Sequence, residues 1–323
     1  MLFEPITNAV YPLLDELAAP STYRAFLDAA FSHANQSAAQ ASPFIPLDLP
    51  LAIGEVLGTP IRPRQLIAAV CLSVWLGADL FDNVADNELE PSWLSFGLTR
   101  VSLGAVTILT VLPHRLIERL SLYDVTASTR HALSLALSQS LWQMSVGQFH
   151  DLGATNEVRC AADYESVLAG KSGAEIALFA RASALLAERP TQEVEAWHAF
   201  GQAIGMSMQL VSDITDIFTD PRGNDLRNGK RTLPILFTLQ QLKGDDLLSF
   251  QTDLTLAEAD NQGAIRRLRD TMRDCGALQY SMLKAEIFRQ QAMRQLQQIV
   301  PCAETRKPLE TLSQAISMLN HQC

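Results

Sequence analysis

Three carboxylates share one face of an apolar helix in the first third of the chain. Asp79, Asp82 and Asp86 are spaced i, i+3, i+7, with Asn83 beside them, so their side chains line one side of a helix. Such carboxylates repel one another unless a cation lies between them, and oxygen-only ligands suit a hard ion such as Mg²⁺. A solvated helix end, with Asp79 capping the helix or pairing with a basic residue, explains this segment about equally well when it is taken alone.

A second acidic helix and a basic loop lie far along the chain. Gln209, Asp213 and Asp216 share a helical face. The polar, glycine-containing turn that follows carries three cations placed to lie over a phosphate, namely Arg227, Lys230 and Arg231. A helix C-terminus with basic residues near its dipole is the plainer interpretation of the turn alone. Two acidic helices together with a basic loop favour a site for metal and phosphate.

Lys171 interrupts an apolar helical stretch. It lies between Gly170 and Gly173, and glycines allow another helix or a ligand to approach the backbone closely. Two interpretations remain open: a lysine that extends its ammonium group to solvent, and a lysine that binds a diphosphate.

The composition indicates an ordinary globular protein. Of 323 residues, 48% are hydrophobic and 19% are charged, and no linker divides the chain, so we expect one helical domain over residues 1–323. A net charge of -10 argues against nucleic-acid binding. No signal peptide is evident, and the longest apolar run, 101–113, is too short to span a membrane. Five scattered cysteines fit a reducing compartment. We therefore predict a cytoplasmic protein without a membrane span.

Apolar residues recur at three- and four-residue spacing through most of the chain, and alternating segments typical of strands are scarce. Several of the helical segments are apolar on more than one face, which is typical of helices inside a large bundle. We predict an all-α fold, a large helical bundle around a central apolar cavity. The expected helices cover residues 8–33, 64–88, 97–120, 124–151, 160–187, 191–219, 231–242, 254–274, 276–299 and 303–320.

Six segments in the same order resemble the trans-prenyltransferase (polyprenyl synthetase) family of class I isoprenoid synthases. The segment 82–86 is similar to the family's first Asp motif, D-D-x-x-D, and 209–216 to its second, Q-x-x-D-D-x-x-D. The segment 171–174 resembles K-T-G-A, and 147–152 resembles G-Q-x-x-D-L. The segment 223–234 is similar to G-K-D-L-x-x-G-K-R-T-L-P, and 58–63 falls where the family has G-K-R-x-R-P.

The resemblance implies an isoprenoid-synthase bundle whose two Asp motifs face each other across the cavity mouth. It implies three Mg²⁺ ions, two of them on the first motif, that bridge an allylic prenyl diphosphate to Asp82, Asp86 and Asp213, with Asp216 in support. Lys171 and Lys230 would add charge to the diphosphate oxygens and are catalytic candidates with the aspartates. Further substrate contacts are implied at Arg62, Asn83, Gln209 and Arg231, with Gly77 and Ala78 at the floor of the product cavity. The family also implies a homodimer.

The sequence departs from the family where a second diphosphate, isopentenyl diphosphate, would bind. Thr59 and Pro60 stand at the family's Lys-Arg pair, and no arginine occurs between Asp86 and Arg100. Asn83 and Ser212 each replace an aspartate. Three interpretations follow: a prenyltransferase whose acceptor is isopentenyl diphosphate or another nucleophile, a terpene-synthase-like lyase that acts on one allylic diphosphate, and a catalytically weak subunit that partners a competent synthase.

Overall fold

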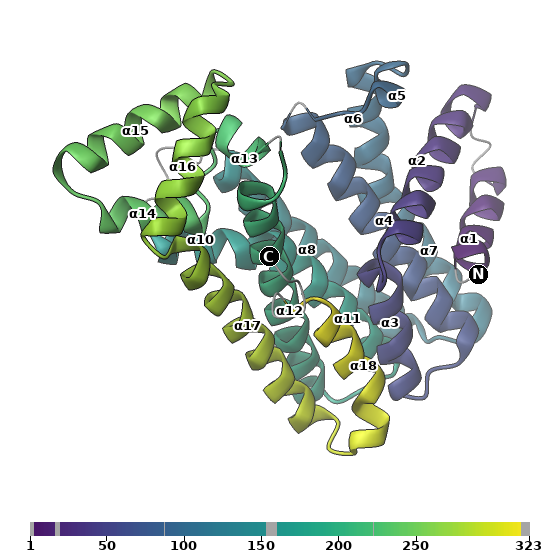
Figure 1. Ribbon diagram of the computed structural model, residues 1–323. Coiled ribbons are helices and arrows are strands. Elements are labelled where there is room, and N and C mark those ends of the chain that lie inside the picture. The colour runs from purple at the N-terminus through teal and green to yellow at the C-terminus, as the bar shows by residue number, and fades with distance from the viewer. Residues whose placement is uncertain (1–2, 17–19, 87, 153–159, 222, 318–323) are drawn as a thin grey trace. The chain divides into compact units, whose positions relative to one another are not determined.

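The computed structural model describes residues 3–16, 20–86, 88–152, 160–221 and 223–317 (Figure 1). The chain forms two compact units. Unit 1 contains residues 1–141, 175–201 and 295–315, and unit 2 contains residues 142–174, 202–294 and 316–323. The described residues form helices and no strand, which confirms the predicted all-α class. The prediction of a single domain over residues 1–323 remains a prediction.

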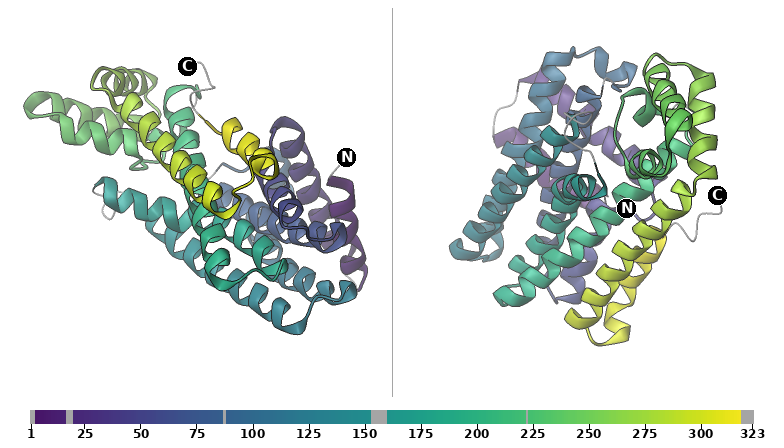
Figure 2. Two further views of the ribbon diagram at one scale, coloured as in Figure 1. Left: turned by 90° about the horizontal axis from the view of Figure 1, so that it is seen from below. Right: turned by 90° about the vertical axis from the view of Figure 1, so that its left-hand side faces the viewer.

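Unit 1 is built around one long helix, α4 (Ile61–Ala85). Around it pack α1 (Phe3–Glu16), α2 (Ser21–Gln40), α3 (Ile45–Val56), α6 (Leu98–Val106), the π-helical turn η1 (Thr107–Val111), α7 (Leu112–Arg119) and the 3₁₀ turn η2 (Leu120–Tyr123). The short helix α5 (Pro91–Leu94) packs on α6, and α18 (Ala303–Ala315) lies beside α3 (Figure 2). Nearly every residue from Leu66 to Leu80 of α4 is buried, as its apolar faces predict.

Gly77 allows α4 and η1 to cross at close range. A Cβ atom on Gly77 would lie 2.6 Å from the backbone nitrogen of Leu109, a separation that no side chain tolerates without a shift of one helix. Gly77 is buried, and the next residue, Ala78, is half-buried. The glycine therefore has a packing role, and the placement of both residues at a cavity floor remains a prediction.

Unit 2 consists of shorter helices around two hydrophobic clusters. Its complete elements are α10 (Ala161–Leu168), the π-helical turn η3 (Ala169–Gly173), α13 (Asn224–Arg227), α14 (Leu233–Gln241), α15 (Gly244–Glu258) and α16 (Gln262–Asp274). Four further helices contribute residues to both units: α8 (Ala127–Leu152), α11 (Ala174–Leu186), α12 (Thr191–Phe218) and α17 (Ala277–Ile299).

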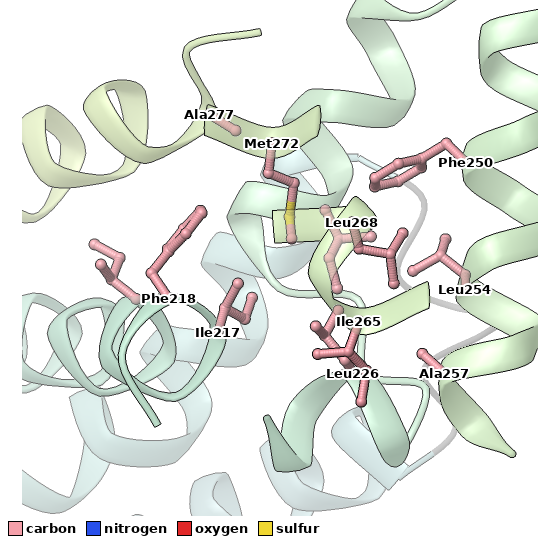
Figure 3. Close-up of a cluster of buried hydrophobic side chains, with 12 residues drawn as sticks. Ile217, Phe218, Leu226, Phe250, Leu254, Ala257, Ile265, Leu268, Met272 and Ala277 are labelled. Carbon is pink, nitrogen blue, oxygen red and sulfur yellow. The ribbon is translucent and has the colours of Figure 1, made fainter. Parts of the chain in front are cut away.

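One of these clusters anchors the end of α12. Figure 3 shows Ile217 and Phe218 of α12 with Leu226 of α13, and with side chains from α15 and α16 around them. Leu268 and Met272 of α16 are fully buried in this cluster. Burial of a side chain of this size stabilises the fold by about 1.5–3 kcal/mol. The cluster therefore fixes the end of α12, which carries the second Asp motif. It also fixes α13, which is part of the basic loop.

Two predicted helices are wrong in their boundaries, and one helix was not predicted. The predicted helix 8–33 is two helices, because Pro20 begins α2 as its N-cap. The predicted helix 254–274 is also two: Asp260 adopts a positive φ of 60°, and the Asn261 side chain accepts a hydrogen bond from the Ala264 N–H to begin α16. Helix α3 was not predicted; it contains two prolines, and one of them lies in the first turn, where no donor is needed.

Two stretches, Ile61–Ala85 and Leu98–Tyr123, are long and apolar enough to cross a membrane by length and composition. Their most apolar windows are 61% and 44% buried, respectively. The helical stretch at 98–123 is longer than the apolar run 101–113 indicated. Because core helices of soluble proteins have the same composition, neither stretch is strong evidence of a membrane span.

Candidate active site

The first acidic motif lies at the C-terminal end of α4 in unit 1. Asp82 is in the last turn, and Asp86 is the C-cap residue, whose N–H donates to the Asp82 carbonyl at 2.8 Å. Asn83 donates from its side-chain amide to Asp79 Oδ2 at 3.3 Å. The asparagine that replaces an aspartate therefore holds a neighbouring carboxylate in place. The Asp79 carboxylate therefore contacts two side chains, Asn83 and His33.

His33 of α2 is the partner of Asp79 that the sequence did not reveal. Its Nε2 lies 3.2 Å from Asp79 Oδ2, and its ring meets Trp93 edge-on. The hydrogen bond to Asp79 raises the pKa of His33 above its ordinary value, although burial opposes this. The pair ties α2 to the acidic end of α4.

The His33–Asp79 pair makes a pH-dependent contribution to stability. Because the pKa of His33 is raised in the folded state, the contribution is fully present below the unfolded pKa of about 6.5 and is lost as pH rises through the folded pKa. We expect His33→Asn to lower the free energy of unfolding by a few tenths to about 1 kcal/mol at pH 5.5 and by less at pH 8.5. Urea unfolding at both pH values measures this, and a loss that grows with pH would contradict it. Burial lowers the pKa of His198, so His198→Asn serves as a control with the opposite slope.

Arg62 does not lie near the first acidic motif. It is exposed in the first turn of α4, and Asp82 is in the last turn of the same helix. Twenty residues of helix separate the two, which corresponds to about 30 Å at 1.5 Å per residue. The structure therefore does not bring Arg62 together with Asp82 and Asp86, although the sequence resemblance grouped them in one substrate site.

In unit 2, Lys171 lies at a local break in the helix. The turn η3 widens the helix there, and Lys171 itself is non-helical, with φ -90° and ψ -110°. A Cβ atom on Gly147 of α8 would lie 2.8 Å from the Lys171 nitrogen, so this glycine allows α8 to pack against the break. The Lys171 ammonium group contacts Asp151 Oδ2 at 2.6 Å. The Lys171 side chain therefore contacts the end of α8, where Asp151 lies.

Asp213 of α12 is the most enclosed carboxylate of the second motif. It is 6% exposed, accepts a hydrogen bond from Gln209 Nε2 at 2.9 Å, and accepts a second from the buried Tyr164 hydroxyl. Gln209 in turn accepts a hydrogen bond from Ser172 of η3. Burial, with the charge of Asp151, raises the pKa of Asp213, and its two hydrogen bonds partly offset that rise. This chain of hydrogen bonds fixes the carboxylate against α10 and η3.

Asp216, one turn further along α12, holds the basic loop. Its two carboxylate oxygens accept the backbone N–H groups of Asn224 at 3.2 Å and Asp225 at 2.8 Å. These are N–H groups at the start of α13, which have no partner within that helix. The loop bends through Gly223 and Gly229, whose φ values of 61° and 66° favour glycine. Asp216 therefore positions the loop that carries Lys230.

Asp225 and Lys230 form the second lysine–aspartate pair of unit 2. The Lys230 ammonium lies 3.4 Å from Asp225 Oδ1, and the Lys230 N–H donates to the Asp225 carbonyl at 3.0 Å. Asp225 is 8% exposed. Burial and the charge of Asp213 raise its pKa, and Lys230 opposes this. Each candidate lysine is thus held by an aspartate.

A small cavity of about 30 Å³ gathers these groups. Five of its lining residues were predicted, namely Lys171, Gln209, Asp213, Lys230 and Arg231. Asp151, Tyr164, Asp225 and Thr232 also line it and were not predicted as site residues. Asp151 belongs to the motif at 147–152, and Asp225 and Thr232 belong to the motif at 223–234, so the motifs themselves held that signal. Tyr164 belongs to no motif. A larger cavity of about 620 Å³, beside Trp142 and His150, contains none of the predicted site residues.

Two arginines of α16 satisfy the free carbonyls at the end of α12. Arg269 donates to the Ile217 and Asp220 carbonyls, and Arg273 donates to the Phe218 carbonyl at 3.1 Å. The last carbonyls of a helix lack partners within it, and cationic donors there also favour the helix dipole. These contacts hold the segment that follows Asp216.

Comparisons with known proteins bear on the family and the fold of the chain. A family model, polyprenyl synthetase, matches residues 99–272, more than half of the chain. The match includes Lys171, Asp213 and Lys230 and begins after Asp86.

The chain is 28% identical over 186 residues to geranylfarnesyl diphosphate synthase of Aeropyrum pernix, covering 54% of this chain and 56% of the relative. It is 30% identical over 169 residues to (2E,6E)-farnesyl diphosphate synthase of Mycobacterium bovis, covering 50% and 45%. The chain thus spans about half the length of the curated relatives it matches.

Solved structures match over nearly the whole chain. Geranylgeranyl pyrophosphate synthetase from Pyrococcus horikoshii superposes with a TM-score of 0.79 at 18% identity, covering 98% of both chains. Geranylgeranyl pyrophosphate synthase from Corynebacterium glutamicum, complexed with calcium and isoprenyl diphosphate, gives 0.74 at 20% identity, covering 98% of this chain and 96% of that one. The fold is the all-α isoprenoid synthase fold. The chain belongs to the polyprenyl synthetase family.

Proposed function

We propose that this chain is a prenyltransferase that ionises an allylic prenyl diphosphate with Mg²⁺ and passes the prenyl group to an acceptor. The observation that carries the proposal is the cavity of unit 2, which gathers Lys171, Lys230 and Arg231 beside Asp213. Cations aimed at a departing diphosphate stabilise the negative charge that develops as the allylic C–O bond breaks. In the proposal, Lys171 and Lys230 bind diphosphate oxygens, and Gln209 orients Asp213.

The carboxylates of the two motifs fit Mg²⁺ by their chemistry. Asp82 and Asp86 lie one turn apart on α4, and oxygen ligands suit this hard ion, which keeps waters and shares its shell with substrate phosphates. We assign Asp82, Asp86, Asp213 and Asp216 as metal ligands, with three ions in all. Asp213 and Asp216 also accept hydrogen bonds from the protein, but each carboxylate has about four lone-pair sites. Bound Mg²⁺ would supply Lewis-acid neutralisation of the leaving diphosphate.

We further propose that the acceptor is not a second diphosphate. Arg62 lies about 30 Å from Asp82 along α4, and Thr59 and Pro60 stand where the family has cations. Each charge-assisted phosphate contact contributes about 1.5–3 kcal/mol, so a second diphosphate would bind poorly without them. The same observation favours the lyase as second candidate, in which water or internal deprotonation quenches the allylic cation.

Product analysis tests which of these functions applies. The chain is incubated with farnesyl diphosphate and Mg²⁺, with and without isopentenyl diphosphate, and the organic products are separated by mass. A hydrocarbon or alcohol from farnesyl diphosphate alone would indicate the lyase. An elongated diphosphate would contradict the proposal about the acceptor. A product only when another nucleophile is added would support transfer to it, and no turnover unless a second synthase is present would indicate the weak subunit.

We propose that the chain forms a homodimer through α8. Trp142 and Phe149 lie seven residues apart on this helix and are 72% and 71% exposed, with Val146 beside them. An exposed apolar stripe of this kind marks an interaction surface, and heptad spacing suits packing against a second helix. We expect light scattering to give a dimer for the wild type and a monomer for Trp142→Glu/Phe149→Glu. Leu283→Glu, at a 59% exposed leucine of α17, should remain dimeric. A wild-type monomer would contradict the proposal.

We also propose a cytoplasmic location. The proposal rests on the five scattered cysteines, which fit a reducing compartment, and on the mostly buried apolar stretch Ile61–Ala85. Cell fractionation tests it, and recovery of the chain with membranes that resists salt washing would contradict it.

A further inference from the structure

Thr232 is a buried threonine at the end of the basic loop; it belongs to the segment 223–234 but was not predicted as a site residue. It is the N-cap of α14, is 4% exposed, and lines the small cavity with Lys171, Lys230 and Arg231. Its carbonyl accepts the first hydrogen bond of α14, from the Leu236 N–H at 3.0 Å. The backbone of Thr232 is therefore fixed by the helix that it begins.

The hydroxyl group of Thr232 has no hydrogen-bond partner among the described residues, although it is enclosed. A threonine at an N-cap ordinarily accepts a hydrogen bond from the N–H of the second or third helical residue. Here the second residue is Pro234, which has no N–H, and no cap hydrogen bond from the side chain forms. Buried hydroxyl groups are almost always paired. Because Thr232 also lines a cavity, its missing partner can be a group that binds from outside the chain.

The surroundings of the hydroxyl indicate the chemistry of that partner. Three cationic side chains line the same cavity, and two of them are held by aspartates, Lys171 by Asp151 and Lys230 by Asp225. The cavity volume of about 30 Å³ corresponds to roughly one water molecule in the liquid. It therefore admits one oxygen atom of a larger anion whose remainder lies outside the cavity. The N-terminus of α14 also favours negative charge at this point.

We propose that Thr232 is a substrate-binding residue whose hydroxyl donates a hydrogen bond to one oxygen of the diphosphate. The inference rests on the proposed function, because it takes the diphosphate as the ligand. Thr232 gains its missing partner when the substrate binds. Lys171 and Lys230 then give up their contacts with Asp151 and Asp225 and bind the diphosphate. An ordered water at this point is the competing occupant, and it predicts a different result in the experiment below.

Two readouts with opposite signs test the proposal, with inorganic pyrophosphate and Mg²⁺ as the probe. Thr232→Val keeps the shape and removes the hydroxyl. We expect its affinity for pyrophosphate, measured by titration calorimetry on the full chain, to fall about tenfold, which is about 1.4 kcal/mol. In the absence of pyrophosphate its urea midpoint should rise, because an unpaired buried hydroxyl has been removed. Thr232→Ser should bind within about twofold of the wild type.

Thr238→Val is the matched control on the same helix. The Thr238 hydroxyl is fully buried but already donates to the Pro234 carbonyl at 2.8 Å, so its loss should lower the urea midpoint and leave pyrophosphate affinity unchanged. Wild-type affinity in Thr232→Val would overturn the inference while the proposed function stands. A lower urea midpoint in Thr232→Val, which a structural water predicts, would also overturn it. Failure of the wild type to bind pyrophosphate would overturn the proposed function and this inference together.

Discussion

Replacing Asp82 with alanine is expected to reduce Mg²⁺-dependent diphosphate release from an allylic diphosphate by about a hundredfold or more. Asp82 is assigned as a ligand in the last turn of α4, and loss of one group that stabilises developing charge typically costs two to three orders of magnitude in rate. Release of inorganic diphosphate from farnesyl diphosphate, followed at saturating Mg²⁺, measures the effect.

Asp79→Asn provides the matched control on the same helix face. Asp79 is one turn from Asp82, but its carboxylate is held by His33 at 3.2 Å and Asn83 at 3.3 Å. We expect this variant to retain the rate within about threefold, a range that uncoupled surface and half-buried positions allow. Equal losses in both variants would mean that the negative charge of the helix end matters and that Asp82 has no particular role.

Replacing Lys171 with glutamine is expected to weaken diphosphate binding by about tenfold to a hundredfold. The reason is the loss of one charge-assisted phosphate contact of about 1.5–3 kcal/mol. Calorimetric titration with Mg²⁺ and inorganic pyrophosphate gives the change directly. The loss is a lower bound on the strength of the contact, because the wild-type lysine must first leave Asp151, which lies 2.6 Å away.

Lys284→Gln is the matched control for Lys171. Lys284 of α17 forms a comparable pair with Glu165 at 2.7 Å, and it does not line the cavity. Its replacement should leave pyrophosphate affinity unchanged. If Lys171→Gln also binds normally and only unfolds at lower urea, Lys171 is a structural partner of Asp151 and not a diphosphate ligand.

The fold class was readable from the sequence because it depends on local pattern. Helix α4 is apolar on more than one face from Leu66 to Leu80, so this part had to be buried, and the structure buries nearly all of it. The boundaries were less readable where a short break interrupts a continuing pattern. The positive φ of Asp260 and the cap at Asn261 divide α15 from α16 within three residues, and periodicity alone passes over such a break.

The candidate site was readable in part, since its charged residues carry a motif but its hydrogen-bond partners do not. Lys171, Asp213 and Lys230 were predicted, and the structure places them on one cavity. Tyr164 lines it through tertiary packing that no spacing encodes, whereas Thr232 lies within the motif segment 223–234 and was passed over because it carries no charge. Arg62 was predicted as a substrate contact because the segment 58–63 resembles a family motif. The length of α4 carries it about 30 Å from Asp82, and its role remains a prediction.

The most direct test of the central claim is release of inorganic diphosphate by the wild-type chain from a single allylic substrate. Geranyl, farnesyl and geranylgeranyl diphosphates are each supplied with Mg²⁺, with and without isopentenyl diphosphate. We expect release from at least one of them that needs Mg²⁺ and does not need isopentenyl diphosphate, or that begins when a nucleophile without a diphosphate is added. Release that occurs only with isopentenyl diphosphate would contradict the claim that one diphosphate suffices, and no release under any of these conditions would contradict the claim that the chain ionises prenyl diphosphates.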